Sequence, residues 1–157
     1  ALPISVHDAF KENSHTMKQT NYKFHSDLPY SLHDMLVNKI SINNDSIKFS
    51  FVEGFVELTE PYPLVPGTIE IQGADLDFCC VYILSRFGYF GGVRGKKMTL
   101  TEFLSVYPDF KFEIVDELHG YNQVVYNGYL STPDSTVLRE MEISMYYTGE
   151  IIYRTEG

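Results

Sequence analysis

The feature that most constrains this chain is a period-two alternation of apolar and polar side chains. Two such runs, MLVNKISI at residues 35–42 and SIKFSF at residues 46–51, flank Asn43-Asn44-Asp45. Short polar side chains at these three positions tolerate the dihedral angles of a tight turn. Because successive side chains of a strand point to opposite faces, the pattern predicts an antiparallel β-hairpin with one apolar face.

Later segments show the same alternation. Residues 68–72 (TIEIQ) place two isoleucines on one face, and Val124, Tyr126 and Leu130 share a face in the final third of the chain. The nearly continuous apolar run 77–84 (DFCCVYIL) is typical of a central strand, and we expect it to be buried on both faces.

The end of the chain predicts one more hairpin. Met141, Ile143 and Met145 alternate with polar residues, and Thr148-Gly149 favours a turn into a last strand at residues 150–154. We therefore expect this last strand to pair with the one before it.

Prolines and glycines predict two loops. Pro61, Pro63 and Pro66 argue against regular strand pairing through residues 59–67. Residues 88–97 (GYFGGVRGKK) contain four glycines and three basic residues, which is typical of a flexible loop.

One short helix follows the second loop. Thr99-Leu100-Thr101-Glu102 matches the capping box, in which a hydroxyl and a carboxylate satisfy free backbone N–H groups at a helix start. Leu100, Phe103 and Leu104 then lie on one side, and Pro108 ends the helix.

Together these elements predict an α+β fold that is mainly β. Their connections are too short for parallel crossovers, so we expect an antiparallel twisted sheet, curled or doubled into a sandwich or half-barrel, with one short helix near residues 100–107 over one opening. The 12 tyrosines and 11 phenylalanines among 157 residues pack well on such a sheet. The predicted core comprises Phe49, Phe51, Ile71, Val81, Ile83, Phe112, Ile114 and Ile143.

The length predicts a single domain, with a large enough core to need no metal or disulfide. Residues 1–16 lack a sustained period and Met17 opens a segment that resembles a natural start, so we expect a leader, tag or flexible arm before a β-rich domain at 17–157. The alternative is a native arm that packs on the domain.

The charge and the cysteine content limit the classes of partner and the cellular compartment that we expect. The net charge is −9, from 12 basic and 21 acidic side chains, which opposes the field of a nucleic acid. The two cysteines, Cys79 and Cys80, are neighbours whose side chains diverge in a strand, and two free thiols favour the cytoplasm. No apolar run reaches the roughly 20 residues that cross a bilayer, so we expect no membrane or nucleic-acid partner.

Few residues resemble a reaction centre. His33-Asp34 could orient an imidazole as a general base, although this pair also fits a turn before the first strand. Asp75 and Asp77 would share one face of a strand, as glycosidase acids do. His25, His33 and His119 lack metal-binding spacing. We therefore expect no catalytic residue, no metal site and no cofactor.

A basic segment could bind an anion. Arg94, Lys96 and Lys97 lie in the glycine-rich stretch and form a possible ligand loop, but the spacing of its glycines does not match a P-loop. The alternative is a solvated loop.

Acids and tyrosines in the final third could bind a basic protein, because charge speeds encounter and tyrosine supplies contact area at low entropic cost. The alternative role for the tyrosines is packing within the sheet. The predicted partner-binding residues are Glu113, Glu117, Tyr129, Glu140, Glu142 and Tyr146.

The run SLHDMLVNKISINNDSIKFSF at residues 31–51 resembles the opening of small β-rich bacterial domains, in which a Leu-His-Asp turn precedes a meander. Some of these domains are immunity proteins of polymorphic toxin systems. The resemblance implies a cytoplasmic binder that shields a toxin and carries no catalytic residue.

We therefore expect a non-enzymatic binding protein, an immunity-type inhibitor of a basic toxin or other protein. A small-molecule carrier with an aromatic-lined pocket inside a curled sheet is the first alternative. A small hydrolase that uses His33 and Asp34 is the second. The sequence leaves the oligomeric state open.

Overall fold

The computed structural model of the chain describes residues 16–84 and 92–156. Within these ranges the chain forms twelve strands, one α-helix and one 3-10 turn. The strands are β1 (Tyr30–Ser31), β2 (Met35–Asn43), β3 (Ser46–Phe51), β4 (Phe55–Glu57), β5 (Leu64–Val65), β6 (Gly67–Ile71), β7 (Cys80–Leu84), β8 (Gly95–Thr99), β9 (Lys111–Gly120), β10 (Gln123–Ser131), β11 (Arg139–Tyr146) and β12 (Ile151–Thr155). The helix is α2 (Leu100–Val106) and the 3-10 turn is η1 (Leu76–Phe78).

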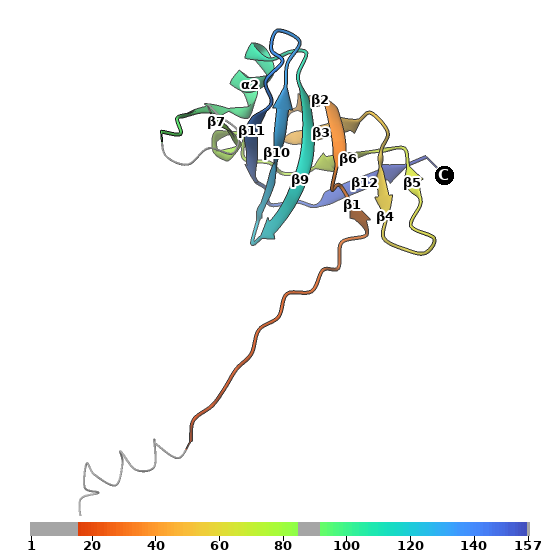
Figure 1. Cartoon of the computed structure of the whole chain (residues 1–157). Coiled ribbons are helices and arrows are strands. Elements are labelled where there is room, and N and C mark those ends of the chain that lie inside the picture. The colour runs from red at the N-terminus through yellow and green to blue at the C-terminus, as the bar shows by residue number, and fades with distance from the viewer. Residues whose placement is uncertain (1–15, 85–91, 157) are drawn as a thin grey trace, which may run out of the picture.

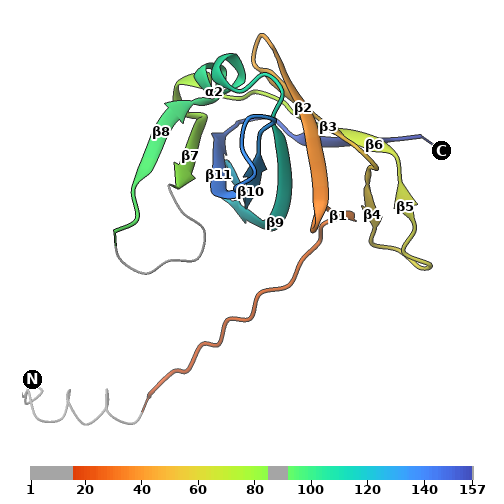
Figure 2. The same ribbon diagram turned by 45° about the horizontal axis from the view of Figure 1, so that its top comes forward.

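Nine of these strands form one antiparallel sheet in the order β12-β6-β3-β2-β9-β10-β11-β7-β8, and β1-β4-β5 form a small second sheet. The large sheet curls, as Figure 2 shows. Its curl brings β3 against β10, which are not neighbours in the sheet, so that the rings of Phe49 and Tyr126 lie 5.7 Å apart. The predicted antiparallel, mainly β fold is confirmed.

The core fills the inside of this curl. Val124, Tyr126 and Leu130 of β10 are fully buried, as their alternation predicts. Of the eight predicted core residues, seven are buried and Phe51 is partly buried against them. One face of the large sheet therefore contains most of the apolar side chains, and the other face carries polar ones.

The predicted hairpin and the predicted helix both form. Strands β2 and β3 pair from Val37–Phe51 to Asn43–Ser46, which confirms the hairpin. The hydroxyl of Thr99 accepts a hydrogen bond of 3.1 Å from the backbone N–H of Glu102 at the start of α2. Leu100 and Phe103 are fully buried, and α2 lies at one end of the curled sheet beside β7 and β8 (Figure 2).

A cluster of aromatic rings joins the small sheet to the large one. Phe55 of β4 is fully buried, and its ring centre lies 5.0 Å from that of Tyr30, 5.5 Å from Phe51 and 5.8 Å from Tyr153. Rings at these separations and tilts pack favourably edge to face. Strands from three distant parts of the sequence therefore share this cluster.

Two predictions about the connections are wrong. Residues 59–67 are not free of pairing, because Leu64–Val65 forms β5 against β4 and β6 begins at Gly67. The last strand does not complete a hairpin with β11, because β12 pairs with β6 at the opposite edge of the sheet. Backbone N–H groups of Thr148 and Gly149 donate to the carbonyls of Gly73 and Gln72, and these bonds carry the chain across to β6.

The predicted strand at 77–84 is shorter and lies on the surface. Asp75 caps η1 by accepting a hydrogen bond of 3.2 Å from the N–H of Asp77, and the strand starts at Cys80. Strand β7 buries one face, not both, because Val81 and Ile83 point to the core while the alternate residues point to the outer face. Gly95 to Lys97 belong to β8 and not to a loop, whereas residues 88–91 of that predicted loop lie outside the described residues.

A β-bulge in β9 inverts the alternation that the sequence shows. Asp116 pairs with Asn127 and Ile114 pairs with Gly128, so that Val115 is left without a partner in β10. Beyond this extra residue every side chain of β9 changes face. Unbroken alternation from Phe112 and Ile114 would place Leu118 inside, but Leu118 is 55% exposed and Glu117 points inward.

The N-terminal segment extends away from both sheets. Residues 1–15 of the predicted leader lie outside the described residues, and residues 16–27 are extended and exposed (Figures 1 and 2). Met17, Tyr22 and Phe24 are between 70% and 93% exposed, and pairing in a sheet begins at Tyr30. The predicted domain boundary at residue 17 stays a prediction.

Candidate functional site

The candidate site lies on the outer face of β7, β9, β10 and β11, which is turned away from the core. Side chains at odd positions of β10 and even positions of β11 point to this face, because Tyr126 and Ile143 point inward. Glu140 and Glu142 of β11 are consequently half-buried between neighbouring strands. The same alternation that directs apolar side chains into the core therefore places these acids on the outer face.

Strand register arranges the outer face into two rows. The first row runs across five strands through successive pairing partners, namely Asp116, Asn127, Glu142, Tyr82 and Lys97. The second row consists of Glu113, Tyr129 and Glu140. Directly opposed side chains in a sheet lie close enough to act on one ligand together.

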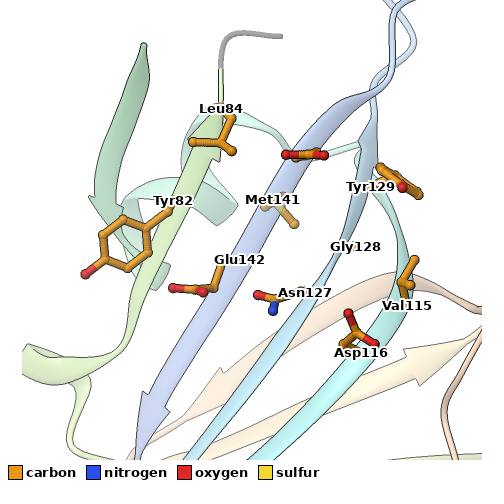
Figure 3. A pocket seen from close by; sticks show the side chains of 10 residues that line it. Tyr82, Leu84, Val115, Asp116, Asn127, Gly128, Tyr129, Met141 and Glu142 are labelled. Carbon is orange, nitrogen blue, oxygen red and sulfur yellow. The ribbon is translucent and has the colours of Figure 1, made fainter. Parts of the chain in front are cut away.

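A cavity of about 480 Å³ opens on this face, and we call it the acidic hollow. In Figure 3, Glu142, Asn127 and Asp116 project side by side from β11, β10 and β9. The hollow is lined by Tyr82, Leu84, Val115, Asp116, Asn127, Gly128, Tyr129, Glu140, Met141 and Glu142. Its wall thus combines three carboxylates with one amide and with apolar and aromatic surface.

Charge in the acidic hollow is unbalanced. Asp116, Glu140 and Glu142 form no ion pair with any residue of the described ranges. The nearest cation of the first row, Lys97, places its Nζ over the ring of Tyr82, 5.5 Å from the ring centre. The described residues therefore give the hollow an excess of negative charge, which favours a positively charged group.

The structure brings five of the six predicted partner-binding residues to this face. Glu113, Tyr129, Glu140 and Glu142 lie in the two rows, and the ring of Tyr146 at the end of β11 is 44% exposed. Tyr146 packs edge to face with Phe78, which is itself 61% exposed, at 6.1 Å between ring centres. These aromatic rings extend the outer face beyond the hollow.

Glu117, the sixth residue, lies on the opposite face of the sheet. Its side chain is only 9% exposed, and its Oε2 accepts a hydrogen bond of 2.9 Å from the N–H of Leu32. Oε1 lies 3.9 Å from Nε2 of His119 and accepts no hydrogen bond from the described residues. The position of Glu117 does not suit the predicted contact with a partner, because the bulge turns this residue inward.

Tyrosines surround the buried carboxylate. The hydroxyls of Tyr126 and Tyr153 are buried and find no hydrogen-bond partner among the described residues. Burial raises the pKa of both phenols, and the charge of Glu117 raises it further. Both phenols are therefore neutral at physiological pH, and this cluster is part of the core.

His33 and Asp34 shape the turn before β2. The N–H of Asp34 donates to the carbonyl of Ile114 at 2.7 Å, and Asp34 has a φ of 64°. Nδ1 of His33 lies 2.6 Å from the carbonyl oxygen of Val115, and Nε2 lies 3.3 Å from the Asp34 carboxylate. The bond to Val115 raises the pKa of the imidazole, and the carboxylate adds to this effect. The left-handed φ of Asp34 brings these two adjacent side chains together.

Other candidate reaction centres have structural roles. Asp75 and Asp77 do not share a strand face, because Asp75 caps η1. Burial raises the pKa of the Cys79 thiol to about 11, which makes it a poor nucleophile. No group of three or more histidine, cysteine or acidic residues within the described ranges could hold a metal ion.

The predicted ligand loop is divided between two faces of β8. Lys97 pairs with Tyr82 and lies on the outer face, whereas Lys96 pairs with Ile83 and emerges on the side of the core. Arg94 precedes the strand and lines the same cavity as Lys96. The three residues therefore do not surround a single ligand.

Three polar residues of the acidic hollow were not predicted as site residues from the sequence, namely Asp116, Asn127 and Tyr82. Asp116 reaches the hollow only because of the bulge, and an isolated glycine within an alternating strand, here Gly128, is the available signal for one. Tyr82 joins through the pairing of β7 with β11, which no local pattern encodes.

Comparisons with protein-family models, with curated proteins and with solved structures find no match for this chain. Within the described residues, no helix has the length and apolar character needed to cross a bilayer.

Proposed function

We propose that this chain is a non-enzymatic binding protein of the cytoplasm that recognises a basic protein through the acidic hollow, as an immunity-type inhibitor of a toxin would. One observation supports this proposal above all others. Three carboxylates line a cavity of about 480 Å³ and form no ion pair with the described residues. Carboxylates without an ion pair in their own chain are complementary to a cationic side chain of a binding partner.

The lining suits an arginine or lysine side chain of the partner. Its cationic head would donate to Glu140, Glu142 and Asp116, and its aliphatic stem would lie against Tyr82 and Tyr129. Charge-assisted hydrogen bonds of this kind are stronger than neutral ones and fix the orientation of the donor. Tyr146 and Phe78 would contribute exposed ring surface beside the hollow.

The two alternative functions receive less support. A carrier needs an open cavity on the apolar face, but there Phe49, Tyr126 and their neighbours pack against one another. A hydrolase based on His33 needs a substrate cleft, whereas both His33 and Asp34 are more than half exposed and hydrogen-bond to build a turn.

Charge reversal of Glu140 and Glu142 tests the proposal. The product of the gene immediately upstream would be expressed in a bacterial host with and without this chain, and the purified pair would be studied by surface plasmon resonance. We expect co-expression to relieve toxicity. We also expect Glu140→Lys with Glu142→Lys to weaken binding at least about 30-fold, because two charges at the centre of an interface change sign.

A matched control reverses two acids elsewhere. Glu53→Lys with Glu156→Lys changes the net charge by the same amount, and both residues are exposed near strands of the other half of the large sheet. Binding by this control should stay within about threefold of wild type at physiological salt. Equal losses in both double variants, or substrate turnover that depends on His33, would contradict the proposal.

A further inference from the structure

A second cavity lies on the opposite side of β8 from Lys97. It has a volume of about 360 Å³ and is lined by Arg94, Lys96 and Arg139 together with Ile83, Leu84 and Gly95. We call it the basic pocket. None of these lining residues is acidic.

Strands β8 and β11 place two of the three cations of the basic pocket. Lys96 extends from the edge strand on the same side as Ile83, its pairing partner. Arg139 opens β11, and its guanidinium stacks over the ring of Tyr107 after α2, 5.5 Å from the ring centre. This stacking restricts the guanidinium, so that less freedom is lost when it binds a ligand.

Concentrated positive charge is unexpected in this chain. The protein carries only 12 basic side chains against 21 acidic ones, and three of the 12 line this one cavity. Lys96 and Arg139 form no ion pair with the described residues. An anion bound between these side chains would be attracted by each of them.

We infer that the basic pocket binds a small phosphate monoester. Two guanidinium groups and one ammonium group match the three terminal oxygens and the roughly two negative charges of a phosphate better than the two oxygens of a carboxylate. The cavity is larger than a phosphate ion, and Ile83 and Leu84 supply an apolar wall for the organic part of the ligand.

The basic pocket adjoins the acidic hollow at Leu84, which lines both, but its three cations line only the basic pocket. Lys97 gives a matched control because it neighbours Lys96 on the same strand, has the same charge and points to the outer face over Tyr82. If the anion were held only by the general positive charge of β8, both lysines would contribute equally to its affinity. If it binds in the basic pocket, only Lys96 contributes.

The experiment is an NMR titration of the full chain with phenyl phosphate, at constant ionic strength. We expect saturable shifts at the amides of Leu84, Gly95 and Arg139. Lys96→Gln and Arg139→Gln should each weaken binding about 5- to 10-fold, the loss of one charge-assisted contact, and Lys97→Gln should change it less than twofold. Unchanged melting temperatures would show that the variants fold.

Three results would overturn the inference. The first is an absence of saturable shifts at millimolar phenyl phosphate. The second is a loss of affinity in Lys97→Gln as large as that in Lys96→Gln. The third is equal binding of benzoate, since the pocket would then not distinguish a phosphate from a carboxylate. Failure of the acidic hollow to bind a basic partner would leave all these measurements unaffected.

Discussion

Gly128 offers the sharpest test of how the bulge supports this fold. A Cβ atom added to Gly128 would overlap the carbonyl oxygen of Glu113 and would lie 2.8 Å from its carbonyl carbon and 3.1 Å from Cα of Ile114. All three atoms belong to the backbone of a paired central strand, which cannot move aside as a flexible side chain can. Gly128→Ala must therefore separate β9 from β10 at the bulge.

We expect Gly128→Ala to lower the free energy of unfolding by about 3–5 kcal/mol, from overpacking and from one or two weakened ladder hydrogen bonds. Gly120→Ala is the control, because its added Cβ meets nothing closer than the Gln123 carbonyl oxygen at 4.0 Å. That change should lie within about 1 kcal/mol of wild type. Urea unfolding followed by circular dichroism measures both. A loss below about 1 kcal/mol for Gly128→Ala would refute the register shift between β9 and β10.

Three further changes test other parts of the structure. Phe112→Ala should cost about 3–5 kcal/mol in urea unfolding, because the ring is fully buried; a loss below about 1 kcal/mol would contradict this. Tyr126→Phe should raise stability by about 1 kcal/mol, since it removes a buried hydroxyl that has no hydrogen-bond partner among the described residues, and a lowered midpoint would show that the hydroxyl is hydrogen-bonded. The pKa of His33 measured by NMR should exceed 6.5, so that its contribution to stability is complete below pH 6.5 and is lost as pH rises through the folded pKa. A folded pKa at or below 6.5 would refute the hydrogen bond to Val115.

Elements that depend only on residues close together in the sequence could be predicted from it. The β2–β3 hairpin needs only alternation and a turn, and α2 needs only a cap and an apolar side. Pairing between distant strands has no such local signal. The pairing of β12 with β6, for example, depends on hydrogen bonds from Thr148 and Gly149 to residues 72–73.

The candidate site could be predicted only in part, for the same reason. Alternation within β10 and β11 is enough to place Tyr129, Glu140 and Glu142 on one face. Asp116 and Glu117 exchange their expected faces at the bulge, and the position of a bulge depends on how β9 meets β10. Acidic composition predicted a negative surface but could not predict a hollow.

The bulge also links the fold to the proposed function. Without the extra residue Val115, Glu117 would lie on the outer face and Leu118 would point into the core. With it, Asp116 joins Glu113, Glu140 and Glu142 on the outer face, so that four acids share one region of the sheet. If the proposed cationic partner binds these acids only in the folded chain, binding and folding would stabilise each other by mass action. The extra residue that sets the register of β9 therefore also determines which acids the proposed partner would meet.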